Sequence, residues 1–165
     1  HLSIRRQRQM CIRDRVVIYD DSRFAFGARL WWLLRWLGHD RVSLLDGGWS
    51  AWQAAAGPVT TAPPEPVPVP FPVNLRADLV VDREGILARD FPSQPADLVL
   101  VDAREAARYR GEVEPIDPIA GSIPGARNVC WQDVTEANGR AKSPEALRSL
   151  LALSLIHISE PTRPY

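Results

Sequence analysis

The sequence predicts an α/β fold in which a parallel sheet is flanked by helices. Short apolar runs of strand type alternate with helical patterns, once before and once after a proline-dense stretch. An apolar content of 45% with 24% charged residues is typical of a globular protein. Each half of the chain has too few strands for a complete sheet, so we expect two partial domains.

The first half begins with a strand at Val16–Asp20, a β-rich apolar run of the kind buried in parallel sheets. Residues 28–38, ARLWWLLRWLG, carry leucines at helical spacing, and Gly38 suits the position just past a helix end. Arg41–Asp46 is the second expected strand. A Gly-Gly turn then leads to a short helix that ends at Gly57.

The two halves are joined by a proline-dense segment. Residues 57–73 contain seven of the 15 prolines, and this composition favours extended, polyproline-like chain over helix or central strand. We therefore predict an interdomain linker at residues 58–73.

The second half is expected to begin with a helix capped by Asp82. Residues 97–104, DLVLVDAR, predict a strand, and a short helix should follow in EAARYRG. A final helix should begin at Ser143, with Pro144 in its first turn.

Both ends of the chain resemble translated sequencing adapters. MCIRDR near the start and LSLIHI near the end can be written as inverted copies of one DNA word. We interpret residues 1–15 and 153–165 as artefacts and exclude them from the fold. The basic run RRQRQMCIRDR would otherwise suggest a phosphate-binding arm, and that alternative depends wholly on these residues.

Charge and cysteine content limit the class of partner. Without Arg5–Arg15 and Leu153–Tyr165 the chain keeps 14 Lys and Arg against 18 Asp and Glu, so we expect no nucleic-acid partner. No apolar run reaches the length of a membrane span, so we expect no membrane partner. Two cysteines form no disulfide framework, which favours the reducing cytoplasm.

Two motifs resemble the tandem-rhodanese sulfurtransferases of the thiosulfate and 3-mercaptopyruvate type. They are LLDGGWSAW in the first half and VDAREAARYRG followed by SIPGA in the second. The resemblance implies that residues 16–57 are the C-terminal part of a first, non-catalytic domain. It also implies that residues 74–152 are the N-terminal part of a second, catalytic domain. Two such partial domains leave sheet edges and core faces uncovered, so we expect poor folding in isolation.

The resemblance also implies a reaction. The family moves a sulfane sulfur from a small anionic donor, thiosulfate or 3-mercaptopyruvate, to cyanide or a thiol through a cysteine persulfide. We expect no cofactor. We also expect no metal, because one internal histidine and one cysteine cannot assemble a metal site. The alternative is a non-catalytic rhodanese-like module that binds or regulates a partner.

The resemblance assigns the donor to arginines in the second half. Arg108 matches the donor-binding arginine of the family, and Arg110 is a second candidate. The loop after them, GEVEPIDPIAG, lacks the further arginine of the mercaptopyruvate type, which tilts the donor toward thiosulfate. Asp102 and Arg104 are expected to form an ion pair inside the domain.

We expect no catalytic residue in this chain. The family's nucleophile opens a loop of the type C-x-x-G-x-T, whereas Cys130 lies in NVCWQD, which has no glycine. We interpret Cys130 as a half-buried cysteine that acts as a small hydrophobe. The nucleophile should follow Ala152, so this fragment is predicted to be inactive. In the first half, Asp20 stands at the equivalent position, where a carboxylate forms no persulfide.

Overall fold

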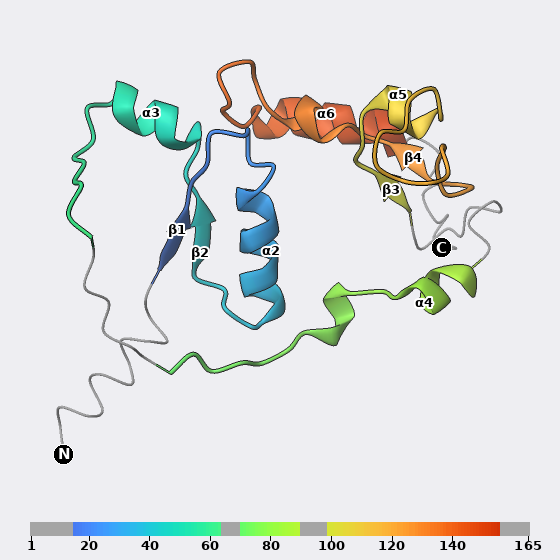
Figure 1. The fold of residues 1–165 in the computed structure, drawn as a ribbon, viewed down its shortest axis with the longest axis horizontal. Helices are drawn as coiled ribbons and strands as arrows, with labels where there is room; N and C mark the ends of the chain where they lie inside the picture. The colour runs from blue at the N-terminus through green and yellow to red at the C-terminus, as the bar shows by residue number, and fades with distance from the viewer. Residues whose placement is uncertain (1–14, 64–69, 90–98, 156–165) are drawn as a thin grey trace, which may run out of the picture. The chain divides into compact units, whose positions relative to one another are not determined.

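The chain forms two compact units in a computed structural model that describes residues 15–63, 70–89 and 99–155. Unit 1 consists of His1–Val80 with Ala137–Arg140, and unit 2 of Val81–Glu136 with Ala141–Tyr165. Figure 1 gives the course of the chain through both units. Of the adapter-like ends, residues 1–14 and 156–165 lie outside the described residues, as does the middle of the proline-dense segment. Residues 153–155 of the expected artefact form the end of helix α6 (Pro144–Leu155).

Unit 1 is built on two parallel strands. β1 (Val16–Ile18) pairs with β2 (Val42–Leu44), with Val16 opposite Val42. The connection between them is α2 (Gly27–Trp36), which contacts both strands and runs alongside them in Figure 1. Helix α3 (Gly48–Ala54) follows β2. These bounds confirm the predicted strand, helix, strand, helix order, with each strand shorter than its apolar run.

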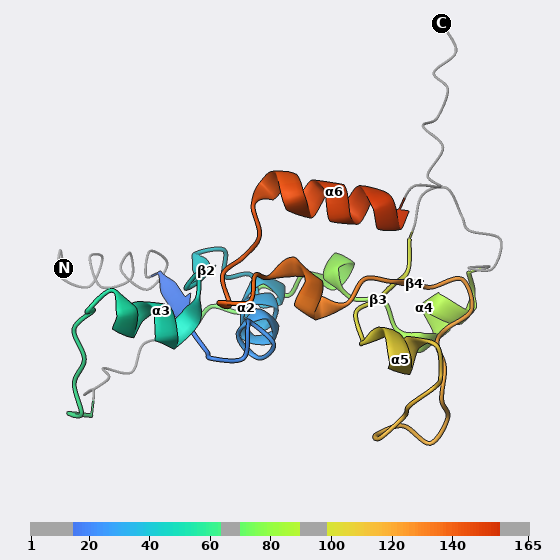
Figure 2. The same ribbon diagram turned by 90° about the horizontal axis from the view of Figure 1, so that it is seen from above.

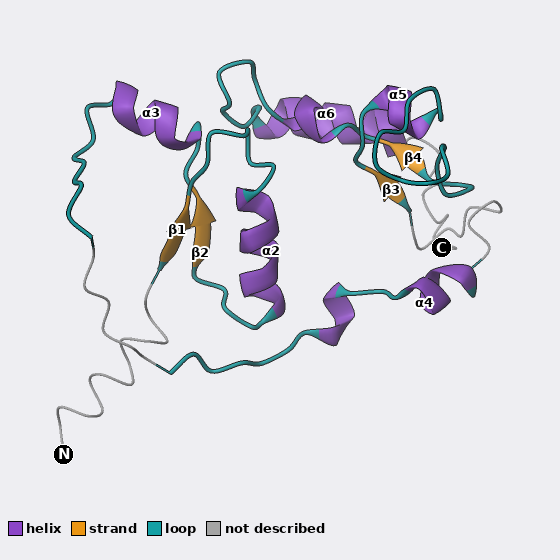
Figure 3. Ribbon diagram, viewed as in Figure 1, coloured by secondary structure: helices purple, strands orange, loops and turns teal. Residues whose placement is uncertain are grey.

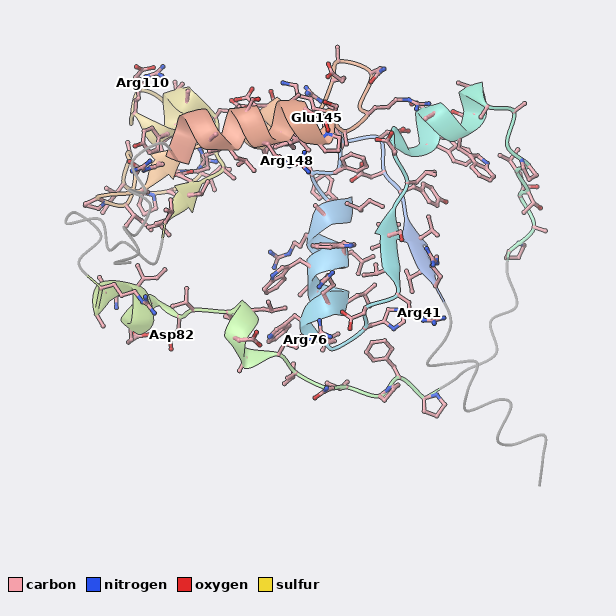
Figure 4. All side chains as sticks on the ribbon, turned by 180° about the vertical axis from the view of Figure 1, so that it is seen from behind. Arg41, Arg76, Asp82, Arg110, Glu145 and Arg148 are labelled. Atoms are coloured by element: carbon pink, nitrogen blue, oxygen red, sulfur yellow. The ribbon has the colours of Figure 1, made fainter. Side chains whose placement is uncertain are left out.

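The C-terminal end of α2 is held by the segment that returns after the prolines. Gly38 follows the C-cap residue Leu37 with φ +90°, which confirms the predicted glycine stop. The backbone N–H groups of Asn74 and Arg76 donate to the carbonyls of Leu37 and Trp36, which the helix leaves without partners. The Arg76 guanidinium also donates to both carboxylate oxygens of Asp40 (2.6 and 2.8 Å), and Figure 4 shows Arg76 beside this end of α2.

The core of unit 1 is small. Ile18 and Val42, one from each strand, are its buried hydrophobic residues among those described. Tyr19 and Trp49 stack with ring centroids 5.8 Å apart at the edge of an apolar cavity of about 480 Å³. Val17 in β1 is 52% exposed and Tyr19 just after it is 58% exposed, so one face of the strand pair is open to solvent.

Unit 2 also contains a parallel pair of strands with helices, as Figure 3 shows by element type. β3 (Val101–Asp102) pairs in parallel with β4 (Arg127–Asn128), and α6 contacts β4. The helices of the unit are α4 (Arg83–Leu87), α5 (Ala106–Tyr109) and α6 (Pro144–Leu155), with a 3₁₀ turn at Trp131–Val134. A further 3₁₀ turn, Ala77–Leu79, belongs to unit 1.

Both predicted helix caps in unit 2 are present. The backbone N–H of Gly85 donates to Oδ1 of Asp82 (2.8 Å) at the start of α4, where Figure 4 labels the aspartate. The backbone N–H of Ala146 donates to Oγ of Ser143 (3.2 Å) at the start of α6. Of the strand expected at residues 97–104, β3 covers Val101–Asp102, and residues 97 and 98 lie outside the described residues.

Among the described residues, no helix combines the length and the apolarity needed to cross a membrane.

Candidate functional site

The first candidate site lies just past β3 in unit 2, where Asp102 and Arg104 form the predicted ion pair. Nε and Nη2 of Arg104 donate to Oδ1 (3.0 Å) and Oδ2 (2.7 Å) of Asp102 in a two-point contact. Nη2 of Arg104 also donates to the carbonyl of Gly121 (2.6 Å). The side-chain hydrogen bond from Arg104 lowers the pKa of Asp102 below its ordinary value. This pair therefore fixes the loop after β3 and keeps both charges engaged within the unit.

Glu114 connects this pair to Arg108, the predicted donor-binding residue. Nη2 of Arg108 donates to Oε1 of Glu114 (2.6 Å), and Nη1 of Arg104 donates to Oε2 (3.3 Å). The Glu114 side chain is only 5% exposed. Its hydrogen bonds from Arg108 and from the backbone N–H groups of Asp117 and Ile116 lower its pKa to about 2. Glu114 is thus a carboxylate held ionised between Arg104 and Arg108.

A third carboxylate completes what we call the arginine cluster, whose members are Asp102, Arg104, Arg108, Glu114 and Asp117. Oδ2 of Asp117 accepts from Nη2 of Arg108 (3.1 Å) and lies 4.0 Å from Nη1 of Arg104. Its side chain is 55% exposed, against 20% for Arg108. The cluster carries three carboxylates against two guanidinium groups, a formal charge of −1.

Arg110, the second predicted donor residue, lies outside the arginine cluster. Nε and Nη2 of Arg110 donate to Oε1 (2.6 Å) and Oε2 (2.9 Å) of Glu112. Both side chains are more than half exposed, and Figure 4 shows Arg110 at the outer edge of this part of the chain. The hydrogen bonds from Arg110 lower the pKa of Glu112.

Backbone contacts hold the segment that carries these residues. The Tyr109 hydroxyl donates to the carbonyl of Ala126 (2.8 Å), which ties the end of α5 to the start of β4. The Asn128 amide donates to the carbonyls of Asp102 and Arg104 (3.0 and 2.8 Å). The loop between the two strands is therefore anchored at both ends, and Arg108 projects from a fixed base.

The second candidate site is the loop after β1 in unit 1, organised around Asp20. Oδ1 accepts from the backbone N–H groups of Ser22 and Phe24 (both 3.1 Å), and Oδ2 accepts from those of Phe26 (3.3 Å) and Gly27 (2.7 Å). Burial raises the pKa of Asp20, but these hydrogen bonds, Gly27 first, outweigh it and lower the pKa overall. Four backbone N–H groups of the loop thus converge on the Asp20 carboxylate, which accepts a hydrogen bond from each of them.

The Asp20 loop has left-handed backbone at two consecutive residues that are not glycine. Arg23 has φ +55° and Phe24 has φ +69°, a conformation that costs free energy for any L side chain. The loop also borders a cavity of about 410 Å³, whose wall includes Asp21 and the Gly47–Gly48 turn. Because the convergent N–H groups are already bonded to Asp20, the loop offers neither a thiol nor a free anion cradle.

Cys130 lies in neither site. It is a half-buried free cysteine that precedes the Trp131–Val134 turn, which agrees with the structural role expected for it. Within residues 15–63, 70–89 and 99–155, no group of three or more His, Cys, Asp or Glu side chains could hold a metal ion. The sequence predictions had not included Glu114 and Asp117. The available signal in the sequence was a group of three acidic residues shortly after Arg108, namely Glu112, Glu114 and Asp117.

The fold matches that of known proteins. The family model of the rhodanese-like domain matches residues 3–55. The crystal structure of SseA from Escherichia coli, described as a 3-mercaptopyruvate sulfotransferase with a rhodanese fold, superposes with a TM-score of 0.72 at 28% identity. The match covers 86% of this chain and 52% of SseA. The chain therefore has an α/β rhodanese fold of parallel strands with flanking helices.

Two relatives extend the match over both units. A probable 3-mercaptopyruvate sulfurtransferase of Pseudomonas aeruginosa is 47% identical over 135 residues, covering 81% of this chain and 46% of the relative. A putative thiosulfate sulfurtransferase, SseB of Mycobacterium tuberculosis, is 39% identical over 137 residues, covering 83% and 48%. The chain is a homologue of the rhodanese-like sulfurtransferases of the thiosulfate and 3-mercaptopyruvate type. It spans about half the length of the curated relatives it matches.

Proposed function

We propose that this chain is part of a cytoplasmic sulfurtransferase that moves a sulfane sulfur from thiosulfate or 3-mercaptopyruvate to cyanide or a thiol. The observation that carries the proposal is the 47% identity over 135 residues to a probable sulfurtransferase, which includes both units. Identity at that level across the strand ends, loops and helices supports a shared chemistry as well as a shared fold.

The proposed reaction needs a cysteine thiolate supplied by another part of the protein. The thiolate attacks the outer sulfur of thiosulfate, an S–S bond forms, and the S–S bond of the donor breaks as sulfite leaves with the electron pair. Cyanide then attacks the outer persulfide sulfur, takes it as thiocyanate and returns the thiolate. Cys130, the one cysteine among the described residues, lies outside any loop of convergent N–H groups.

Arg108 is proposed to bind the anionic donor, with Arg110 as the second candidate. Arg108 lies at the end of α5, following the carboxyl end of β3, and open α/β sheets bind their ligands at the carboxyl ends of strands. A guanidinium offers two parallel donors, which suits the oxygens of thiosulfate or the carboxylate of 3-mercaptopyruvate. Arg108 is partly shielded, whereas Arg110 is mostly solvated, so Arg108 provides the stronger electrostatic contact.

The test measures thiocyanate formed from thiosulfate and cyanide. We expect the 165-residue chain to be inactive and Cys130→Ser to change nothing. We expect a longer reading frame that carries a C-x-x-G-x-T loop after Ala152 to be active and to lose activity when that cysteine becomes serine. Turnover by the chain itself that Cys130→Ser abolishes would contradict the missing nucleophile.

The alternative function is a non-catalytic rhodanese-like module, and Asp20 is the observation that favours it. The resemblance implies that Asp20 stands where the catalytic domains of the family have a cysteine, and its carboxylate accepts from the backbone N–H groups of its own loop. If the longer reading frame shows the same replacement in unit 2, the enzyme proposal fails and the binding or regulatory module stands.

A further inference from the structure

Arg108 is held by two carboxylates whose environments differ. The Glu114 side chain is 5% exposed and accepts hydrogen bonds from Arg104, Arg108 and two backbone N–H groups. The Asp117 side chain is 55% exposed, and its Oδ2 lies 3.1 Å from Nη2 of Arg108 and 4.0 Å from Nη1 of Arg104. If another anion displaced Glu114, the two arginines and the two backbone N–H groups would lose their acceptor. If an anion displaced Asp117, only Nη2 of Arg108 would lose a hydrogen-bond acceptor.

The backbone of Asp117 is fixed although its side chain is exposed. Its N–H donates to Oε1 of Glu114 (3.0 Å), so the main chain at this position is anchored to the buried part of the cluster. The carboxylate can therefore rotate away from Arg108 into water without unfolding the loop. An exposed aspartate loses little when it leaves an ion pair, because water solvates it again.

We propose that Asp117 is a displaceable counter-ion of Arg108, so that an anionic donor binds by taking its place on the guanidinium. The proposal rests on the donor-binding role proposed above for Arg108. With Asp117 in place the arginine cluster has a formal charge of −1 and repels an anion. With the Asp117 carboxylate turned outward, the four remaining side chains are neutral overall, and the Nη2 hydrogen that it occupied is open.

Asp117 thereby sets the affinity of the site without touching the reacting sulfur. It competes with every anion for Arg108, and it repels a dianion such as thiosulfate more strongly than a monoanion. The stretch around it has carboxylates where a further arginine would strengthen donor binding. Weak binding with rapid release of the anion is the expected property.

The test titrates thiosulfate into the longer reading frame with its loop cysteine changed to serine, because the 165-residue chain is expected to fold poorly, and it compares Asp117→Asn with the otherwise unchanged protein. Calorimetry gives the affinity, and the arginine Nε–Hε signals in NMR show which guanidinium responds, with Arg108→Gln identifying the Arg108 signal. We expect Asp117→Asn to tighten thiosulfate binding about fivefold, at the upper end of what an exposed ion pair contributes. Pyruvate, a monoanion, should gain less than thiosulfate.

The matched control is Glu112→Gln, which removes one exposed carboxylate from Arg110 in the same loop. It should leave the thiosulfate affinity within about twofold of wild type, the change expected when a distant, solvated charge is removed. Asp117→Glu keeps the charge and should also stay near wild type. These two variants show whether the effect of Asp117→Asn comes from the contact with Arg108 or from net charge.

Separate outcomes overturn the two proposals. If thiosulfate shifts the Arg108 signal equally in wild type and Asp117→Asn, Arg108 binds the anion but Asp117 does not compete. If Glu112→Gln tightens binding and Asp117→Asn does not, Arg110 is the donor residue. If thiosulfate moves no Arg108 signal in any variant, the donor role of Arg108 fails and the counter-ion role with it. Should Asp117→Asn lose the Arg104 and Arg108 signals of the folded cluster, Asp117→Ser is titrated in its place.

Discussion

Removal of the Asp20 carboxylate should open the loop after β1 while the strand pair stays formed. In Asp20→Ala, four backbone N–H groups lose their acceptor, those of Ser22, Phe24, Phe26 and Gly27. The same carboxylate caps the start of α2, because Gly27 is the first residue of that helix. The perturbation is therefore local, and its size follows from the hydrogen bonds.

Water replaces the carboxylate at some of these donors but not at all of them. Phe26 is exposed and its hydrogen bond is long (3.3 Å), so its N–H finds water at little cost. Gly27 is buried and its hydrogen bond is short (2.7 Å), so its N–H stays unsatisfied. A lost cap costs about 2 kcal/mol at the upper end of measured values. That free energy corresponds to about a 30-fold change in the local opening equilibrium.

Hydrogen exchange of the Gly27 amide measures this opening directly. Exchange in Asp20→Ala should be about 30-fold faster than in wild type after correction for the intrinsic rate. Because the folded pKa of Asp20 lies below its ordinary value of 3.8, its stabilisation is complete above that value and is lost as the pH falls through the folded pKa. Wild type should therefore approach the variant only in strong acid.

Asp21→Asn is the control, since Asp21 accepts from the backbone N–H and the hydroxyl of Ser50 (both 3.0 Å) rather than from this loop. It should speed exchange at Ser50 and leave Gly27 unchanged. Equal exchange at Gly27 in wild type and Asp20→Ala would show that the carboxylate does not hold the loop, and the reasoning would be wrong.

Three further predictions concern unit 2 and the whole chain. The Glu114 carboxyl should titrate near pH 2 by carbon NMR, so that its contribution to the cluster persists below pH 4.5 and disappears near pH 2; titration near 4.5 would mean that Arg108 does not hold it. Tyr109→Phe should speed amide exchange at Tyr109 and Ala126 several-fold through loss of a hydrogen bond worth about 1 kcal/mol, and unchanged exchange would refute that contact. The purified chain should show no cooperative thermal transition in calorimetry, because no large side chain among the described residues is fully buried; a single sharp transition would contradict this.

The elements that could be predicted from sequence are those with strong local signals. Leucines at helical spacing and Gly38 gave α2 nearly its full length, and the side chains of Asp82 and Ser143 marked the starts of α4 and α6. β4 was missed because its two residues, Arg127 and Asn128, have no apolar pattern, and only the pairing with β3 makes them a strand. Such pairing depends on residues about 25 positions away, which a local pattern does not contain.

The candidate site was predicted in part for the same reason. The Asp102–Arg104 pair could be inferred, because the two residues are neighbours in sequence and opposite in charge. The location of Arg108 was expected from a resemblance, but its two carboxylate partners come from a loop whose course the sequence pattern does not define. The donor roles of Arg108 and Arg110 stay predictions.

The glycine turn after β2 has a consequence for how tolerance to substitution is interpreted. Gly47 and Gly48 both have positive φ, and a Cβ at Gly48 would overlap the backbone carbonyl of Asp20. A saturation-mutagenesis survey would therefore score Gly48 as indispensable, at a position with no side chain and no chemistry. In such a survey, a residue at a close contact between two backbone segments tolerates substitution as poorly as a catalytic residue does. In this protein, intolerance at Gly48 would mark the place where the start of α3 contacts the backbone of the Asp20 loop, and not a catalytic residue.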